Sequence, residues 1–330
     1  MKPRRLKGHE AAVTCCIASR ARPGIIASSG EDGRICWFDL RCKDVLFTID
    51  LGEQPVSSLC FKAGNEDIVY ASSGTKVLCL DIHMVSSWKP LETYNYNKDE
   101  INQIAYSSKS NFLAAADDSG DVKIIDTSQQ CLYKTLRAVH TSICSSVQFL
   151  SWKPWAAITG GLDSKLAMWD FSKGRPSNVI DYGMPEVDGT VSCESGLATM
   201  KSKNFSQSKN FQSRSKKSGI QAANQATGRN LGKRIQLDYS LGGHTAAVSC
   251  VSFSLFGERG KFLISGGNDA CVKLWDWSRY FCAEQTSCNN DLILNIDVKK
   301  KVNWLCTTTA DSENLVVCDT SKLLKIYTVL

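Results

Sequence analysis

The chain has 330 residues, of which 43% are hydrophobic and 22% are charged, and its formal net charge is +6. This composition excludes an intrinsically disordered protein. No uncharged apolar stretch approaches the roughly 18 residues that a membrane span needs, and residues 1–9 are charged without the apolar core of a signal peptide. We therefore expect a soluble protein of the cytoplasm or the nucleus.

The first elements in chain order are short strands that recur with one period. An apolar triplet with the spacing apolar-x-x-apolar-x-apolar begins at residues 13, 56, 101, 144, 248 and 302. Each triplet is followed by a second strand, and in most units by a turn rich in Asp and Gly and a third, alternating strand. In five units the third strand closes on an aspartate: Asp39, Asp81, Asp126, Asp170 and Asp276. Units of about 44 residues built this way cannot cover their own apolar faces, so the repeat predicts an all-β propeller.

The number of blades depends on the interval between the fourth and the next readable unit. That interval equals two periods plus about 17 residues, and its only candidate remnant of a blade is residues 187–193. A six-bladed ring, a seven-bladed ring with a defective fifth blade, and a ring that has lost part of a unit all fit. We favour the seven-blade geometry, because it requires only that one blade has lost part of the repeat pattern. Blades 1–4 then occupy residues 1–180, the remnant and a basic loop occupy residues 181–240, and residues 241–330 form the last two blades.

The two ends of the chain are expected to meet. The last unit stops after its third strand, residues 323–329, and residues 1–7 precede the first unit without another assignment. An outer strand supplied by residues 1–7 would complete the last blade and cover its exposed edge.

Residues 195–237 concentrate the positive charge of the chain. They contain nine Lys or Arg and no acidic residue, whereas the rest of the chain has 30 basic and 33 acidic residues. A segment this polar and without periodicity predicts a disordered loop. We favour a solvated linker, and the alternatives are a nuclear-import signal or weak nucleic-acid contact through Lys216-Lys217 and Lys233-Arg234.

Two dipeptides recur in phase with the repeat. Gly-His stands at residues 8–9 and 243–244, with Val139-His140 as a variant, and Trp-Asp stands at residues 169–170 and 275–276, with Phe38-Asp39 as a variant. In these features the chain resembles the WD40 family. The resemblance implies a hydrogen-bonded relay in each complete blade, formed by a histidine, a Ser or Thr, a turn aspartate and a tryptophan. The matching residues are His9, Ser28 and Asp32; His140, Thr159, Asp163 and Trp169; and His244, Ser265, Asp269 and Trp275.

These Ser, His and Asp residues also invite a hydrolase interpretation. A nucleophile needs one exposed position with an oxyanion hole, whereas this set recurs three times at the same phase of the repeat, so we interpret it as structural. The acidic run of residues 117–121 lacks the bidentate Glu of an EF-hand loop and is interpreted as a hairpin turn. The 15 cysteines include no Cys-x-x-Cys pair and are expected to be reduced core residues. No cofactor or metal is expected.

Further motifs indicate partners. Residues 100–102, 112–126, 143–147, 266–269 and 301–304 carry a resemblance to one family of WD40 repeat proteins, which is itself similar to substrate receptors of cullin-4 RING ubiquitin ligases. That resemblance implies docking on the damaged-DNA-binding adaptor through a Trp-Asp-x-Arg element after a third strand. The nearest match is Phe38-Asp39-Leu40-Arg41, with Phe in place of Trp; the alternative is a surface arginine beside a hairpin.

The sequence therefore predicts a non-catalytic scaffold, a monomer that works within a larger complex as a substrate receptor. The alternative function is a chromatin- or nucleic-acid-associated scaffold that uses residues 195–237. An enzyme is the least supported function.

Overall fold

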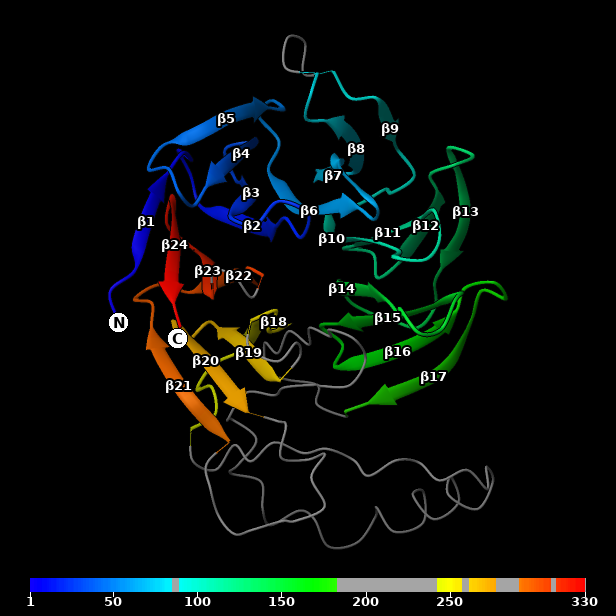
Figure 1. Cartoon of the computed structure of the whole chain (residues 1–330). Coiled ribbons are helices and arrows are strands. Elements are labelled where there is room, and N and C mark those ends of the chain that lie inside the picture. The colour runs from blue at the N-terminus through cyan, green and yellow to red at the C-terminus, as the bar shows by residue number, and fades with distance from the viewer. Residues whose placement is uncertain (85–88, 183–241, 257–260, 277–290, 310–312, 330) are drawn as a thin grey trace, which may run out of the picture.

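The computed structural model describes residues 1–84, 89–182, 242–256, 261–276, 291–309 and 313–329. Every described element is a β-strand, and the strands form six antiparallel sheets of four strands each. The sheets stand around a common axis as the blades of a β-propeller (Figure 1), which confirms the predicted architecture. Within the described residues, no helix has the length and apolar character needed to cross a membrane.

Blades 1–3 follow one another without interruption. Blade 1 contains β2 (Val13–Ala18), β3 (Ile25–Gly30), β4 (Arg34–Asp39) and β5 (Val45–Asp50). Blade 2 contains β6 (Val56–Lys62), β7 (Asn65–Ser73), β8 (Lys76–Asp81) and β9 (Glu92–Tyr94). Blade 3 contains β10 (Ile101–Tyr106), β11 (Phe112–Asp117), β12 (Val122–Asp126) and β13 (Cys131–Leu136).

Blades 4–6 complete the described part of the ring. Blade 4 contains β14 (Cys144–Phe149), β15 (Ala156–Gly161), β16 (Lys165–Asp170) and β17 (Arg175–Asp181). Blade 5 contains β18 (Val248–Phe253), β19 (Phe262–Gly267), β20 (Cys271–Asp276) and β21 (Leu292–Asp297). Blade 6 contains β22 (Val302–Thr307), β23 (Asn314–Asp319), β24 (Leu323–Thr328) and β1 (Arg4–Lys7).

The apolar triplet marks the innermost strand of every blade. All six innermost strands shift their register between the first and third residue, as β2 does between Val13 and Cys15. Side chains of a regular strand alternate between two faces, and a bulge adds one residue to that alternation. The bulge therefore explains why the first two apolar residues are three positions apart and the last two are two positions apart.

The core lies mainly between neighbouring blades. Separate clusters of buried apolar side chains join blades 1 and 2, 2 and 3, 3 and 4, 5 and 6, and 6 and 1. The innermost strands also contact each other directly across these five junctions. A further cluster lies within blade 4 alone among the described residues. At the five junctions, the stability of each blade depends on its neighbours.

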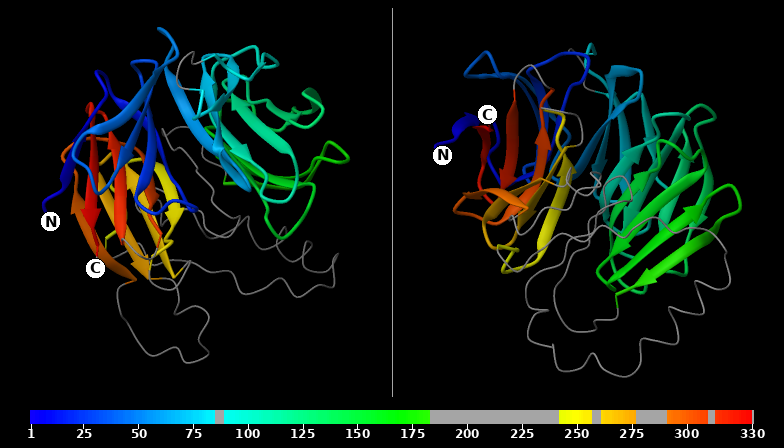
Figure 2. Two further views of the ribbon diagram at one scale, coloured as in Figure 1. Left: turned by 45° about the horizontal axis from the view of Figure 1, so that its top comes forward. Right: turned by 60° about the horizontal axis from the view of Figure 1, so that its bottom comes forward.

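The ring closes through the N-terminal strand. β1 pairs antiparallel with β24, and Leu6 lies opposite Leu324. Both leucine side chains are buried, in the cluster that joins blades 6 and 1. Figures 1 and 2 show the two ends of the chain next to each other at this blade.

The step from β17 to β18 runs through residues 183–241, which lie outside the described residues. The predicted remnant of a blade at residues 187–193 and the basic segment 195–237 fall in this range. The structure therefore shows six blades, and a seventh would have to lie within residues 183–241.

Candidate functional site

The predicted relay residues of blades 4 and 5 lie within hydrogen-bond distance of one another. In blade 4, His140 Nδ1 lies 3.0 Å from Asp163 Oδ1, and His140 Nε2 lies 2.7 Å from Thr159 Oγ1. Trp169 Nε1 donates to the same Thr159 oxygen over 2.9 Å. Because a carboxylate only accepts hydrogen bonds, His140 Nδ1 must carry the proton that faces Asp163.

Blade 5 repeats this geometry with serine in place of threonine. His244 Nδ1 lies 2.9 Å from Asp269 Oδ1, and His244 Nε2 lies 2.8 Å from Ser265 Oγ. Trp275 Nε1 donates to Ser265 Oγ over 2.9 Å. The relay therefore ties the loop that precedes the blade to the second strand, the following turn and the third strand.

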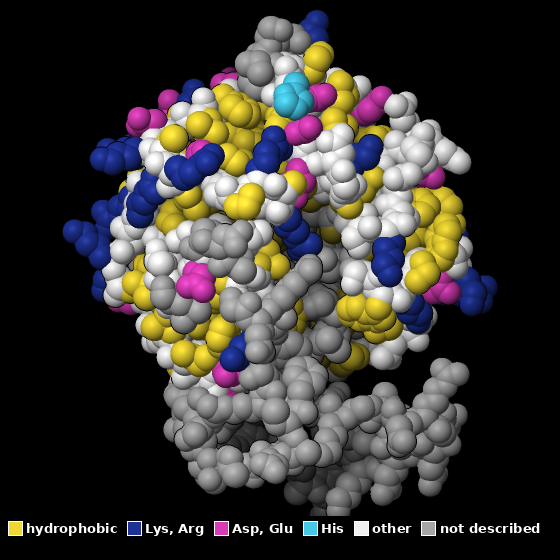
Figure 3. All heavy atoms as spheres, viewed as in Figure 1, with side chains coloured by type: hydrophobic (Ala, Val, Ile, Leu, Met, Phe, Trp, Pro, Cys, Tyr) yellow, Lys and Arg dark blue, Asp and Glu magenta, His cyan; other side chains and the backbone are white. Residues whose placement is uncertain are grey.

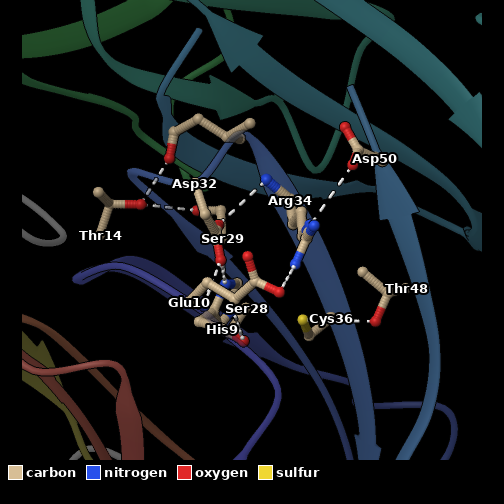
Figure 4. A network of polar contacts seen from close by, with 11 residues as sticks. His9, Glu10, Thr14, Ser28, Ser29, Asp32, Arg34, Cys36, Thr48 and Asp50 are labelled. Atoms are coloured by element: carbon tan, nitrogen blue, oxygen red, sulfur yellow. Dashed lines mark hydrogen bonds and ion pairs between the residues drawn. The ribbon is translucent and has the colours of Figure 1, made fainter. Parts of the chain in front are cut away.

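Blade 1 contains a shortened relay (Figure 4). His9 Nδ1 lies 3.1 Å from Asp32 Oδ1, and His9 Nε2 lies 2.8 Å from Ser28 Oγ. Phe38 occupies the position of Trp169 and Trp275, so no indole donates to Ser28. Trp37, one residue earlier, faces the other side of the strand and stacks on Phe47 with ring centroids 4.9 Å apart.

Burial separates these groups from any substrate. The hydroxyl-bearing residues Ser28, Thr159 and Ser265 are each 0% exposed. A nucleophile must reach solvent or a pocket, so the geometry supports a bracing role. In each relay the amide that follows the histidine also donates to the aspartate, for example Glu10 N to Asp32 Oδ2 over 2.7 Å.

The carboxylates of two relays are held in their charged form. Burial would raise the pKa of Asp32, but donation from the Glu10 amide and from His9 outweighs it, and the pKa falls below its ordinary value. The pKa of Asp269 is lowered in the same way, by His244 and the Thr245 amide acting against burial. Both aspartates therefore remain anionic acceptors at neutral pH.

One glycine position decides which kind of brace a blade uses. Gly30, Gly161 and Gly267 end the second strand of the three blades with a histidine. A Cβ there would lie 2.6–2.7 Å from both the histidine Nδ1 and the aspartate Oδ1. Real Cβ atoms do not approach this closely, so the histidine brace requires glycine at this position.

Blades 3 and 6 place an aspartate at this position, and the sequence patterns did not identify it as part of a brace. Asp117 accepts from Asn97 Nδ2 over 2.8 Å. Asp319 pairs with Lys325 Nζ, which also donates to Val298 O over 2.7 Å. Asp117 and Asp319 are fully buried. A buried aspartate at the end of a second strand, in a unit without Gly-His, would have indicated this substitute.

The residues expected to bind a partner lie at the end of β4. Arg41 Nε lies 3.0 Å from Asp39 Oδ1, and Arg41 Nη2 lies 2.7 Å from Asp39 Oδ2. The Arg41 side chain is 80% exposed, whereas Asp39 is 10% exposed and Phe38 is buried. Of the three predicted residues, Arg41 alone projects a functional group into solvent.

The other blades show what is particular to Arg41. In four blades the aspartate that ends the third strand accepts from the amide two residues later: Arg41 N, His83 N, Ser128 N and Ser172 N. In blades 3 and 4 the serine hydroxyl also donates to that aspartate. The turn is therefore built by the aspartate, and the guanidinium of blade 1 is an addition to it.

The turn of Arg41 is also fixed to the neighbouring blade. Arg4 of β1 donates from Nη1 to Leu40 O and from Nη2 to Cys42 O. Figure 3 shows Lys and Arg side chains gathered beside β1 and β5, at the upper left. Arg4 thus holds the turn of Arg41 in place.

Asp39 gives a prediction for acid stability. Arg41 lowers the pKa of Asp39 because its N–H groups donate to the charged carboxylate. As the pH falls, the Asp39 carboxylate takes up a proton at a higher pH in the unfolded chain than in the folded chain. The stability that this difference in pKa contributes is therefore present above a pH of about 4 and is lost as the pH falls through the lower folded-state pKa. We expect Asp39→Asn to make the fall in melting temperature between about pH 5 and pH 2 shallower than in the wild type. Equal slopes in thermal melts would contradict this role of Asp39.

Seven of the twelve described cysteines are buried, four are partly buried and Cys42 is exposed, so the expectation of core residues holds for most of them. None of the described cysteines forms a disulfide. Burial raises the pKa of the Cys15 thiol to about 12 and that of Cys36 to about 11. Within the described ranges, no group of three or more His, Cys, Asp or Glu side chains could hold a metal ion.

Comparison with known proteins agrees with this geometry. The family description "WD domain, G-beta repeat" matches residues 2–39, 88–126 and 235–276, and each match ends on the aspartate that closes a third strand. The chain is also similar to a Dictyostelium discoideum protein named WD repeat-containing protein 53 homolog, with 33% identity over 175 residues. The alignment covers 52% of this chain and 47% of that relative, so the chain spans about half the length of the relative that it matches. A ring of six blades that carries the relay at the repeat positions, together with these matches, shows that the chain belongs to the WD40 repeat family.

Proposed function

We propose that this WD40 scaffold acts as a substrate receptor of a cullin-4 RING ubiquitin ligase, and that Arg41 docks on the damaged-DNA-binding adaptor of that ligase. WD40 propellers are protein-interaction scaffolds, and the family is typically non-catalytic. The adaptor comes from the resemblance of Phe38-Asp39-Leu40-Arg41 to the docking element of such receptors. The compartment in which the complex forms is the cytoplasm or the nucleus.

The observation that carries the proposal is an exposed guanidinium held by a carboxylate. Asp39 accepts from both Nε and Nη2 of Arg41, and Arg4 fixes the same turn from the neighbouring blade. The Arg41 side chain therefore loses little conformational freedom when a partner binds it, which favours affinity. Arginines at the centre of an interface are frequent hot spots.

The test replaces Arg41 by serine, the residue that blades 3 and 4 have at the same position. Arg41→Ser reproduces the serine of those turns, whose amide and hydroxyl both donate to the aspartate. We expect co-purification of the adaptor from cells to fall at least about tenfold. The melting temperature should stay within about 1 °C of the wild type, since the side chain is exposed.

The matched control is Arg175→Ala, which removes an exposed arginine from the first position of β17, directly after the corresponding turn of blade 4. This variant should retain the adaptor. Arg41→Lys keeps the charge without the planar fork and should recover only part of the binding. Full retention of the adaptor by Arg41→Ser would reject the docking role. An equal loss of the adaptor in Arg41→Ser and Arg175→Ala would also reject it.

The nucleic-acid alternative depends on residues 195–237, which lie outside the described residues. It predicts DNA binding whose affinity falls steeply with salt and disappears when residues 195–237 are removed.

A further inference from the structure

A second candidate site lies where blade 6 meets blade 1. A pocket of about 620 Å³ is lined by β1, β24, the β23–β24 turn, the β21–β22 loop and residues 10–12. The β23–β24 turn joins the second and third strands of its blade, whereas the turn of Arg41 joins the third and fourth strands of blade 1. These turns lie at opposite ends of their blades, so the pocket and Arg41 belong to opposite poles of the propeller.

The pocket carries unneutralised positive charge. Arg5, Lys300 and Lys322 line it, are exposed, and make no ion pair with any residue that the structure describes. The remaining charged groups of the lining are already paired: Lys299 with Asp297, Lys325 with Asp319, and Glu10 with Arg34. Figure 4 shows that the Glu10 carboxylate turns to Arg34, 2.6 Å away. Three positive charges therefore face one pocket without a counter-charge.

The strand register adds to this imbalance. Arg5 on β1 lies directly opposite Lys325 on β24. Like charges on directly opposed residues of an antiparallel pair are destabilising. Asp319 compensates Lys325, but Arg5 keeps its charge toward the pocket. A bound anion would supply the counter-charge that Arg5 lacks.

The rim is held by backbone hydrogen bonds between segments that are far apart in the sequence. Thr320 N donates to Lys301 O over 3.1 Å, and Val13 N donates to Ser321 O over 3.1 Å. These bonds tie the β23–β24 turn to the β21–β22 loop on one side and to the start of β2 on the other. The backbone segments that carry Lys300 and Lys322 are therefore held in place before a ligand arrives, which lowers the entropic cost of binding.

We propose that this pocket binds a phosphate monoester carried by a polypeptide partner. A phosphoserine or phosphothreonine has a charge of about −1.5 to −2 at neutral pH and three acceptor oxygens, whereas a carboxylate balances one of the three cations. A nucleic-acid backbone needs a track of cations, whereas these surround one pocket whose lining includes Ala11, Ala12 and Leu323. Residues 195–237 have the same sign of charge and do not complement the pocket.

The experiment measures fluorescence anisotropy of the full chain with a labelled peptide pool that contains one phosphoserine flanked by random residues. The unphosphorylated pool, inorganic phosphate as competitor, and a single-stranded DNA of about 20 nucleotides are the other arms. The test variant is Arg5→Gln/Lys300→Gln/Lys322→Gln. The control variant is Lys43→Gln/Lys153→Gln/Lys173→Gln, which removes three exposed lysines from turns at the other pole.

We expect the phosphorylated pool to bind, inorganic phosphate to compete with it, and the test variant to bind at least about tenfold more weakly than the control variant. Equal binding of the unphosphorylated pool, no binding of either pool, or unchanged binding by the test variant would overturn the proposal. DNA binding that depends on the same three cations, without phosphopeptide binding, would overturn the assignment to a polypeptide. The test variant should still co-purify the adaptor, so this proposal and the role of Arg41 fail independently.

Discussion

Removal of residues 1–8 lowers the free energy of unfolding by about 4 kcal/mol in our expectation. The deletion takes away the outer strand of blade 6 and the fully buried side chain of Leu6. Burial of one leucine contributes about 2 kcal/mol, and the lost ladder bonds and the newly exposed edge of β24 account for the remainder. For a domain of this size the melting temperature should fall by about 8 °C.

Two point variants separate this effect from simple truncation. Leu6→Ala removes the buried side chain and should reproduce about half of the loss, whereas Lys7→Ala changes an exposed residue of the same strand and should be neutral. The deletion also removes Arg4 from the turn that holds Arg41, so adaptor co-purification should weaken with it. A melt that is unchanged after the deletion would show that β1 does not close the ring.

The second large effect is expected at a relay histidine. His140→Ala leaves the buried Thr159 hydroxyl and the Asp163 carboxylate without the ring that bridges them. A buried polar group without its partner costs about 1–3 kcal/mol, and the missing ring adds a cavity, so we expect a loss of about 3 kcal/mol. Differential scanning calorimetry should show a decrease of about 6 °C in the melting temperature.

Blade 1 supplies the matched control for this prediction. Trp169→Phe removes the indole donor and copies the natural state of blade 1, where Phe38 stands beside an intact His9–Ser28 pair. This variant should lose about 1 kcal/mol, clearly less than His140→Ala. If Trp169→Phe proved as damaging as His140→Ala, the histidine would not be the centre of the brace.

The sequence predicted the features that repeat. The six innermost strands begin at the six triplets, and the aspartates that end the third strands stand where the pattern placed them. The three relays bring together the residues that the resemblance to the WD40 family implied, since each relay lies within one blade and its preceding loop. Repetition makes such local contacts predictable from the sequence, because the same pattern recurs in several units.

The substitutes for the relay were harder to predict. In these substitutes a buried carboxylate still has a partner, Asn97 for Asp117 and Lys325 for Asp319. The partner residues are of other types than in the relay. A pattern defined by histidine and tryptophan therefore misses them. Their common feature is a charge buried at one structural position, which becomes visible when the strands are paired.

The sequence by itself determined the fold class and the phase of the repeat, because these follow from short-range spacing and from the need to bury apolar faces, and the relay residues were implied by its resemblance to a known family. The tertiary structure alone decided that Arg4 holds the turn of Arg41 and that Arg5, Lys300 and Lys322 face one pocket. Arg5 comes from the N-terminal end of the chain and Lys300 and Lys322 from the C-terminal end, and they meet because β1 pairs with β24. The same pairing places Arg4 beside the turn of Arg41. Contacts of this kind have no period in the sequence, because each occurs once and depends on the closure of the whole ring.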